Sequence, residues 1–318
     1  MTQEERTTQQ FSPYWLVLGG IAGAVAGFRY WRQRRAQQTS PLIKSAARQV
    51  ALVTGASSGI GRVFALKLAE LGYDVILVAR RRERLESLAA EITAAYGVEA
   101  AVVAADLSTE AGIQRVEQVL AATDTLALLV NNAGFGLNGP FAESAIDSHL
   151  QMVQVHVEAV VRLTRTALPA LLARRRGAII NVSSLMAFYP MYGSTTYSAT
   201  KCYLRAFTEA LYQELQGTGV RAQVLCPGFV ETELQDVAEI DRPALPQCFW
   251  MSPNTVVARS LRDLANDRAV SVPGLGYRGL AALSSFIPRP LLYAAGSLLG
   301  RSRERQLAAI SCQPQAKE

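Results

Sequence analysis

Thr54-Gly55-Ala56-Ser57-Ser58-Gly59-Ile60-Gly61 is the stretch of the chain that decides its fold. It follows the apolar, β-branched run Val50 to Thr54 and leads into Arg62 to Leu71, where apolar residues recur at helical spacing. Because its three glycines carry no Cβ, the backbone can turn tightly and approach a pyrophosphate, whose charge a helix N-terminus attracts. The strand, the glycine turn and the helix together predict a dinucleotide-binding loop.

Five further apolar runs follow this loop, and segments with helical periodicity separate them. They are Val75 to Val78, Ala101 to Ala105, Leu126 to Asn131, Ala178 to Ser183 and Arg221 to Cys226. Runs that are apolar throughout predict strands buried on both faces. We therefore expect an α/β fold with a Rossmann-like, doubly wound parallel sheet, which binds ligands at the carboxyl ends of its strands.

The composition argues against several classes of site. The 318 residues, half of them apolar, suffice for one large domain with a buried core. The four cysteines form no C-x-x-C pair, so neither a disulfide framework nor a zinc site is expected. Only His149 and His156 are present, so no histidine-rich metal centre is expected, and a Ser/His/Asp hydrolase would have to use one of them.

The net charge of +6 comes from one segment. Arg29 to Arg48 holds six of the 32 basic residues and no acidic residue, and the remaining 26 balance the 26 acidic residues. Positive charge beside an apolar segment favours an anionic membrane surface over a nucleic-acid-binding face. We expect contact with a membrane and none with nucleic acid.

The apolar segment itself, Tyr14 to Phe28, carries no charge and is extended by two interfacial aromatic residues, Tyr30 and Trp31. We expect one N-terminal transmembrane helix over 14–31, after a tail at 1–13. The cations follow the span, which places the catalytic domain on the cytoplasmic side. An interfacial or re-entrant anchor is the alternative, because the span is short. Its glycines, spaced by four residues, suit close helix packing in a homo-oligomer, although glycine is common in membrane helices.

The remaining domain boundaries follow from composition. A basic linker is expected at 32–49 and a catalytic domain at 50–269. Within that domain, residues 234–254 combine prolines with large apolar residues, which suits a substrate lid. The segment 270–318 is predicted to be an apolar C-terminal extension and tail, either a lipid-contacting substrate entrance or a packed domain edge.

Four motifs in order resemble the short-chain dehydrogenase/reductase family over Val50 to Thr232. The glycine loop has its T-G-x-x-x-G-x-G spacing, and Asn131-Asn132-Ala133-Gly134 matches its N-N-A-G. Tyr197-Ser198-Ala199-Thr200-Lys201 matches its Y-x-x-x-K, and Pro227-Gly228 followed by Thr232 matches its P-G-x-x-x-T. The resemblance implies a nicotinamide cofactor, bound by residues of these motifs and of the second and third strand ends. These are Thr54, Gly55, Ser57, Ser58, Gly59, Ile60, Gly61, Arg80, Asp106, Leu107, Asn132, Ala133, Gly134, Tyr197, Lys201, Pro227, Gly228, Val230 and Thr232.

The resemblance also implies the catalytic group. Tyr197 and Lys201 lie four residues apart on a helix and share a face, so we expect the ammonium, with a cationic nicotinamide, to lower the pKa of the phenol. Tyr197 would donate a proton to a carbonyl oxygen as hydride arrives, and Lys201 would hold the nicotinamide ribose. Ser184 matches the family serine that binds the substrate oxygen, with Ser183 as the alternative.

His156 departs from the family, which carries an asparagine there that passes protons through a water to the lysine. A neutral imidazole has one donor and one acceptor and can relay a proton, or it can merely fill space. We include His156 among the predicted catalytic residues on the interpretation that it relays a proton.

Cofactor choice depends on the end of the second predicted strand, Val78-Ala79-Arg80-Arg81-Arg82, where no carboxylate is present. Arg80 can pair with the 2′-phosphate of NADP(H), whereas an acidic residue would repel it. NADP(H) is therefore predicted, with NAD(H) possible in principle if these arginines only flank a helix and Glu83 neutralises one.

The motifs predict an oxidoreductase that interconverts a ketone or aldehyde and an alcohol on a lipophilic substrate. Relatives with this layout handle steroids, retinoids or long-chain oxoacyl compounds. The alternative is a membrane-tethered NADP(H)-binding regulator or scaffold without turnover. Intact Ser184, Tyr197 and Lys201 argue against it, and the glycine spacing disfavours sugar-nucleotide epimerase or dehydratase chemistry.

Overall fold

The computed structural model describes residues 48–137, 139–232, 247–284, 286–288 and 290. The predicted tail, the predicted anchor, nearly all of the basic linker, residues 234–246 of the predicted lid and the chain from 291 lie outside these residues. Across the described part of the chain, no helix is both long enough and apolar enough to cross a membrane. The predicted transmembrane helix at 14–31 therefore stays a prediction.

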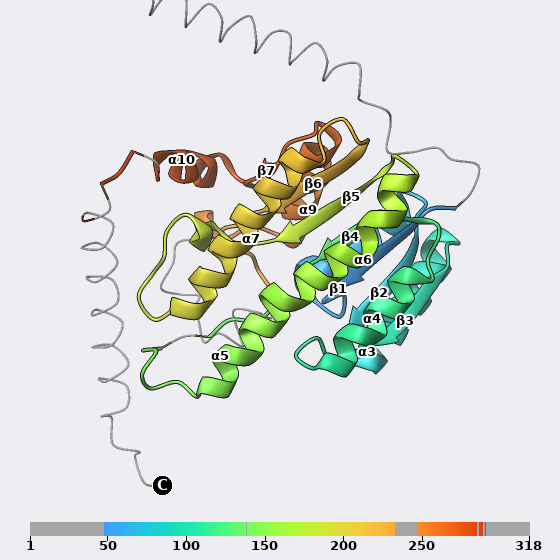
Figure 1. Cartoon of the computed structure of the whole chain (residues 1–318), viewed down its shortest axis with the longest axis horizontal. Helices are drawn as coiled ribbons and strands as arrows, with labels where there is room; N and C mark the ends of the chain where they lie inside the picture. The colour runs from blue at the N-terminus through green and yellow to red at the C-terminus, as the bar shows by residue number, and fades with distance from the viewer. Residues whose placement is uncertain (1–47, 138, 233–246, 285, 289, 291–318) are drawn as a thin grey trace, which may run out of the picture. The chain divides into compact units, whose positions relative to one another are not determined.

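Among the described residues, seven parallel strands form one sheet in the order β3-β2-β1-β4-β5-β6-β7 (Figure 1). They are β1 Val50–Thr54, β2 Asp74–Ala79, β3 Ala100–Ala104, β4 Leu126–Asn131, β5 Gly177–Val182, β6 Val220–Leu225 and β7 Val270–Ser271. The first six confirm the predicted strands to within one residue at each end. The two-residue β7 was not predicted. Since it pairs with β6, the sheet extends past the 50–269 range expected for the catalytic domain.

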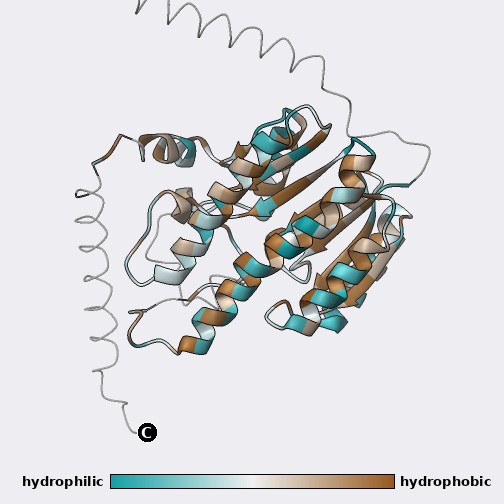
Figure 2. Cartoon of the chain, in the orientation of Figure 1, coloured by the Kyte–Doolittle hydropathy of each residue, from teal (hydrophilic) through white to brown (hydrophobic). Residues whose placement is uncertain are grey.

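Helices cover both faces of the sheet, as a doubly wound fold requires. One face carries α2 Gly59–Glu70, α3 Arg82–Tyr96 and α9 Pro253–Ala265, and the other carries α4 Glu110–Ala121, α6 Ala159–Ala173 and α7 Thr195–Glu214. Figure 2 shows the apolar strands between these layers. The other described elements are α5 Ile146–Val153, the π-helix η1 Gln154–Glu158, the 3-10 helices η2 Leu185–Ala187 and η4 Gln247–Phe249, and α10 Leu275–Leu283.

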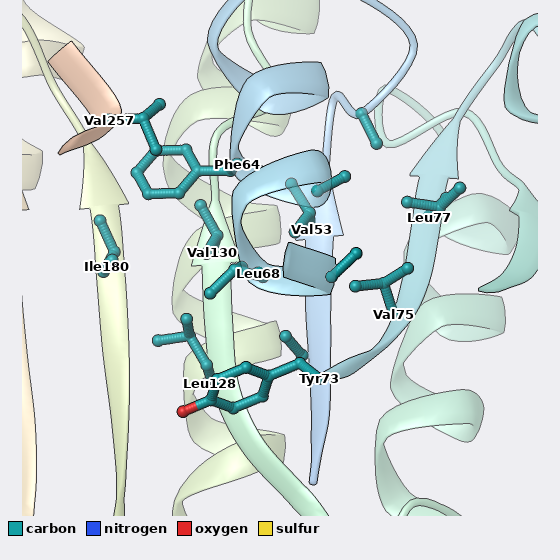
Figure 3. Packing of buried hydrophobic residues seen from close by; sticks show 14 of the residues in the cluster. Val53, Phe64, Leu68, Tyr73, Val75, Leu77, Leu128, Val130, Ile180 and Val257 are labelled. Carbon is teal, nitrogen blue, oxygen red and sulfur yellow. The ribbon is translucent and has the colours of Figure 1, made fainter. Parts of the chain in front are cut away.

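Core packing fixes α2 over the sheet. Phe64 and Leu68 are essentially fully buried, and from α2 Phe64 points towards Val257 while Leu68 lies beside Val130 (Figure 3). Burying each side chain contributes roughly 1.5–3 kcal/mol. This packing holds the N-terminus of α2 beside the carboxyl ends of β1 and β4. The strand order reverses between these two strands, which is where open α/β sheets bind ligands.

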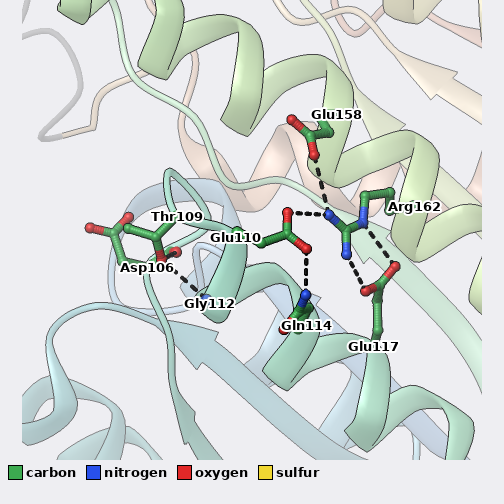
Figure 4. Close-up of polar contacts among 8 residues, drawn as sticks. All are labelled: Asp106, Thr109, Glu110, Gly112, Gln114, Glu117, Glu158 and Arg162. Atoms are coloured by element: carbon green, nitrogen blue, oxygen red, sulfur yellow. Dashed lines mark hydrogen bonds and ion pairs between the residues drawn. The ribbon is translucent and has the colours of Figure 1, made fainter.

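Helices α5, η1 and α6 form one continuous rod, braced by Arg162 of α6 (Figure 4). Its guanidinium donates two hydrogen bonds to Glu117 of α4, at 3.0 and 2.6 Å. It also donates to Glu110 at 2.6 Å and to Glu158 at 3.2 Å. A bidentate pair gives both strength and geometry. Because Glu158 is the last residue of η1, the network ties the π-helix to α4.

Candidate active site

The ends of β1 and β4 are locked together by Thr54 and Asn132. The Thr54 hydroxyl accepts hydrogen bonds from the backbone N–H of Asn132 at 2.9 Å and of Ala133 at 3.0 Å. In return, the Asn132 side-chain amide donates to the carbonyl of Thr54 at 2.9 Å and that of Gly55 at 3.3 Å. Two of the predicted motifs thus form one rigid platform at the switch point of the sheet.

The glycine loop on this platform is shaped as a cradle. Gly55 and Gly59 have φ of +67° and +55°, which glycine adopts without strain. A Cβ on Gly61 would overlap the carbonyl oxygen of Gly55, and one on Gly59 would lie 3.0 Å from the methyl group of Thr232. The first turn of α2 carries no acidic residue, and the Ser58 side chain does not cap it. These features fit the pyrophosphate of a dinucleotide.

Arg80 and Arg81, which follow β2, differ in their contacts with the glycine loop. Arg81 donates hydrogen bonds to the hydroxyl groups of Ser57 and Ser58, both at 3.0 Å, although the sequence analysis did not select it. Arg80 is exposed and makes no side-chain hydrogen bond or ion pair with any described residue. A hollow of about 310 Å³ outside the loop is lined by Ser57, Ser58 and Arg84, among others. The immediate end of β2 holds no carboxylate.

The other predicted cofactor residues also lie at the carboxyl ends of strands. One carboxylate oxygen of Asp106, after β3, accepts from the backbone N–H and hydroxyl of Ser108 at 3.0 and 2.8 Å, and Leu107 is buried beside it. Pro227, after β6, accepts a hydrogen bond from the N–H of Leu185 at 2.8 Å. Val230 is buried and pairs with Met251, which attaches the described end of the predicted lid to this loop.

Tyr197, Lys201 and Ser184 come together beside this cradle. The Lys201 ammonium nitrogen lies 5.5 Å from the centre of the Tyr197 ring and donates to the carbonyl of Val182 at 3.0 Å. Ser183 donates to the backbone carbonyl of Lys201 at 2.8 Å, so it anchors α7. Ser184 is the serine whose hydroxyl contacts Tyr197.

The electrostatics of this group differ from the expectation. Burial raises the pKa of Tyr197, and the contact with the Ser184 hydroxyl opposes this only in part. Burial also lowers the pKa of Lys201 to about 8. The expected lowering of the phenol pKa by the ammonium was therefore wrong for the protein alone, because desolvation of the phenolate dominates. Tyr197 is protonated at neutral pH, the form that a general acid requires.

His156 is fully buried in η1 and uses both ring nitrogens. Nε2 accepts from the backbone N–H of Phe135 at 3.1 Å, so the neutral ring carries its hydrogen on Nδ1, which lies 3.0 Å from the Thr200 hydroxyl. That hydroxyl in turn donates to the carbonyl of Tyr197 at 2.9 Å. Burial, with the nearby Lys201 charge, holds the pKa of His156 well below its ordinary value. The ring thus links the loop after β4, through Phe135, to α7.

A buried polar ladder, which the sequence analysis missed, lies under the site. The side-chain amide of Asn131 donates to Asn181 at 2.9 Å and to Thr164 at 3.2 Å, and that of Asn181 donates to Thr208 at 2.9 Å. These bonds join β4, β5, α6 and α7. Two asparagines within otherwise apolar runs were the available signal, since a buried amide needs partners.

Comparison with known proteins settles the class. A family model described as short chain dehydrogenase matches residues 49–242, which is more than half of the chain. The chain belongs to the short-chain dehydrogenase/reductase family. It is therefore a nicotinamide-dependent oxidoreductase, as the motifs predicted.

Individual relatives agree. This chain is 34% identical to a very-long-chain 3-oxoacyl-CoA reductase of Anas platyrhynchos over 203 residues, and the alignment covers 61% of this chain and 64% of that protein. It is 31% identical over 260 residues to very-long-chain 3-oxoacyl-CoA reductase-A of Danio rerio, covering 79% and 78%. Its structure resembles a short-chain dehydrogenase from Sphingobium yanoikuyae in complex with NADPH, with a TM-score of 0.68, 29% identity and coverage of 85% and 98%.

Tyr277 is a residue of this short-chain dehydrogenase/reductase that the sequence analysis placed outside the catalytic domain. Its ring packs so tightly on Gly228 that a Cβ there would overlap it. Its hydroxyl accepts from the N–H of Phe229 at 3.3 Å and donates to the carbonyl of Phe249 at 2.6 Å. Helix α10 therefore supports the predicted cofactor loop, and the glycine of the P-G motif leaves room for this contact.

Proposed function

We propose that this enzyme uses NADPH to reduce the ketone of a lipophilic substrate, with a long-chain 3-oxoacyl thioester as the leading candidate. The observation that carries the proposal is the grouping of Ser184, Tyr197 and Lys201 beside the glycine cradle. The substrate class is suggested by the names of its relatives, which are very-long-chain 3-oxoacyl-CoA reductases. Steroids and retinoids are the other lipophilic candidates.

In the proposed reaction, Ser184, Tyr197 and Lys201 each have a separate role. When bound, the nicotinamide cofactor would supply a hydride to the carbonyl carbon. The hydroxyls of Ser184 and Tyr197 hold the carbonyl oxygen by hydrogen bonds, and Tyr197 transfers its proton to that oxygen as negative charge develops there. Lys201 would hold the ribose hydroxyls of the cofactor, and its charge would stabilise the phenolate that Tyr197 becomes.

The test of this function is NADPH oxidation by the detergent-solubilised full chain. The substrate panel comprises a long-chain 3-oxoacyl-CoA, a ketosteroid and retinal, with NADH in parallel. We expect turnover with the oxoacyl thioester. If the chain binds NADPH tightly but turns over none of the three substrates, the result would favour an NADP(H)-binding regulator without catalytic activity.

We propose that His156 positions the site and does not relay protons. Both of its nitrogens are used in bonds to Phe135 and Thr200, and the chain of bonds ends at the carbonyl of Tyr197, which has no proton to pass on. The ring instead sets the distance between the loop after β4 and the catalytic helix α7.

Replacing His156 by Leu should leave the part-buried N–H of Phe135 without its acceptor, which costs roughly 1–3 kcal/mol of unfolding free energy, while the Thr200 hydroxyl keeps its bond to the carbonyl of Tyr197. The rate should fall while its pH dependence keeps its shape. His156→Gln should restore part of both losses, because its amide oxygen can reach the Phe135 N–H. Urea unfolding and pH–rate profiles measure these effects. A changed pH profile with unchanged stability would instead indicate a relay.

We propose a preference for NADP(H), supported by Arg80 at the end of β2 and by the absence of a carboxylate there. Arg80→Glu should raise the NADPH dissociation constant by roughly 10–100-fold, because a charged hydrogen bond is worth about 1.5–3 kcal/mol. The NADH constant should not rise. Arg165→Glu, an exposed change of equal charge on α6, is the control, and cofactor fluorescence is the measurement. Equal weakening of both cofactors would contradict this role.

We further propose that the 14–31 segment anchors a homo-oligomeric enzyme in a membrane, with the catalytic domain on the cytoplasmic side. The sequence supports this through its uncharged span and following cations. An anchored site would meet lipophilic substrates where they concentrate.

A further inference from the structure

Helix α9 and the start of α10 enclose a second hollow, of about 390 Å³. Its lining includes Arg259 and Arg262 of α9, Arg278 and Leu275 of α10, and Thr255. Three of the lining residues are arginines and none is acidic. The volume lies in the range of small-molecule sites, roughly 300–1,000 Å³.

Most of this positive charge is not neutralised within the described chain. Arg259 is paired, since it donates to the buried carboxylate of Asp263 at 2.8 Å. Asp263 also accepts from Ser271 at 2.9 Å, so the pair is held in place. By contrast, the exposed side chains of Arg262 and Arg278 make no hydrogen bond or ion pair with a described residue. The hollow therefore carries two uncompensated guanidinium groups beside one fixed guanidinium.

The hollow adjoins α10, the helix that packs on the loop after β6. Gly274 and Leu275 lead into the turn of α10 that carries Tyr277, whose ring packs on Gly228. The same helix accepts a hydrogen bond at the carbonyl of Leu280 from Tyr189, which follows Ser184 and η2. A ligand bound at the hollow would thus lie next to the helix that supports the P-G loop.

We propose that Arg262 and Arg278, with Arg259, bind a phosphate ester. Guanidinium groups suit this ligand because their planar N–H donors match phosphate oxygens. On the proposed function, the phosphates are those of the coenzyme A part of the substrate, joined to the reacting thioester by its long, flexible pantetheine arm. A phospholipid headgroup offers the same chemistry, so the test separates these two sources.

The first test compares two thioesters of the same 3-oxoacyl chain, one of coenzyme A and one of N-acetylcysteamine, which has no phosphate. The double variant Arg262→Ala with Arg278→Ala should raise KM for the coenzyme A ester by roughly tenfold or more, since each lost contact is a charged hydrogen bond. KM for the short ester and kcat for both should not change. Arg115→Ala, an exposed arginine on α4, is the control.

The second test does not depend on turnover. Binding of free coenzyme A, of inorganic phosphate and of vesicles is measured for the full chain and the double variant. The vesicles are phosphatidylcholine with and without phosphatidylserine, and the readout is the increment due to the anionic lipid. Weaker coenzyme A binding in the variant assigns the hollow to the substrate, and a lost lipid increment assigns it to a headgroup. Unchanged binding in every arm would overturn the proposal, whether or not the enzyme reduces oxoacyl thioesters.

Discussion

Replacing Tyr197 by Phe should lower kcat by roughly 10²–10⁴-fold, the usual contribution of a positioned general acid. In the proposed mechanism the phenol is the proton donor beside Ser184, and burial keeps it protonated at neutral pH. Phenylalanine preserves the ring and its edge contact with His156, whose centres lie 5.8 Å apart. NADPH affinity and thermal stability should therefore change little. Steady-state kinetics and a cofactor titration separate the two effects.

Tyr203→Phe is the matched control for this variant. Tyr203 lies on the same helix but is 42% exposed and stacks on Phe207. Removing its hydroxyl should leave kcat unchanged. Substantial turnover in Tyr197→Phe would mean that another group supplies the proton.

Replacing Gly61 by Ala should have the second large effect, on both cofactor binding and stability. The new methyl group would overlap the carbonyl oxygen of Gly55 and lie 2.5 Å from the side-chain nitrogen of Asn132. Neither atom is the free end of a flexible side chain, because Asn132 is itself held by Thr54. Overpacking of this kind costs typically 1–3 kcal/mol of unfolding free energy. The displaced loop should also bind NADPH at least about tenfold more weakly, since phosphate contacts to backbone N–H groups are charge-assisted.

Gly279→Ala is the control for the glycine variant. A Cβ there would meet no atom within 4 Å, and the residue lies within α10. Alanine is the better helix former by about 1 kcal/mol, so stability should be equal or higher. Chemical denaturation and NADPH titration measure both proteins. Normal cofactor binding by Gly61→Ala would show that the loop does not need this glycine.

The sheet could be predicted because its strands are buried on both faces and therefore read as continuous apolar runs. β1 illustrates this, since Ala51 and Val53 enter one core cluster while Leu52 enters the other. Strand β7 escaped prediction because two residues carry no periodicity. The packing of Tyr277 on Gly228 also could not be predicted, because Gly228 lies 49 positions earlier in the chain.

The motif residues of the candidate site could be found because each motif is local in the chain. The contacts and electrostatic environment of these residues could not be predicted from the sequence. The choice between Arg80 and Arg81 at the glycine loop depends on the direction of neighbouring side chains at a turn. The pKa of Tyr197 depends on burial, which only the folded chain determines. The bonds of His156 to Phe135 and Thr200 join residues far apart in sequence.

The most direct measurement of the central claim follows the hydride itself. The full chain is incubated with a long-chain 3-oxoacyl-CoA and NADPH carrying deuterium at the transferable position of the nicotinamide, and the product is analysed by mass spectrometry. The account predicts one deuterium on the new alcohol carbon for the native enzyme and at least about a hundredfold less labelled alcohol with Tyr197→Phe over the same time. Binding of both ligands by the native enzyme with no labelled alcohol would contradict it.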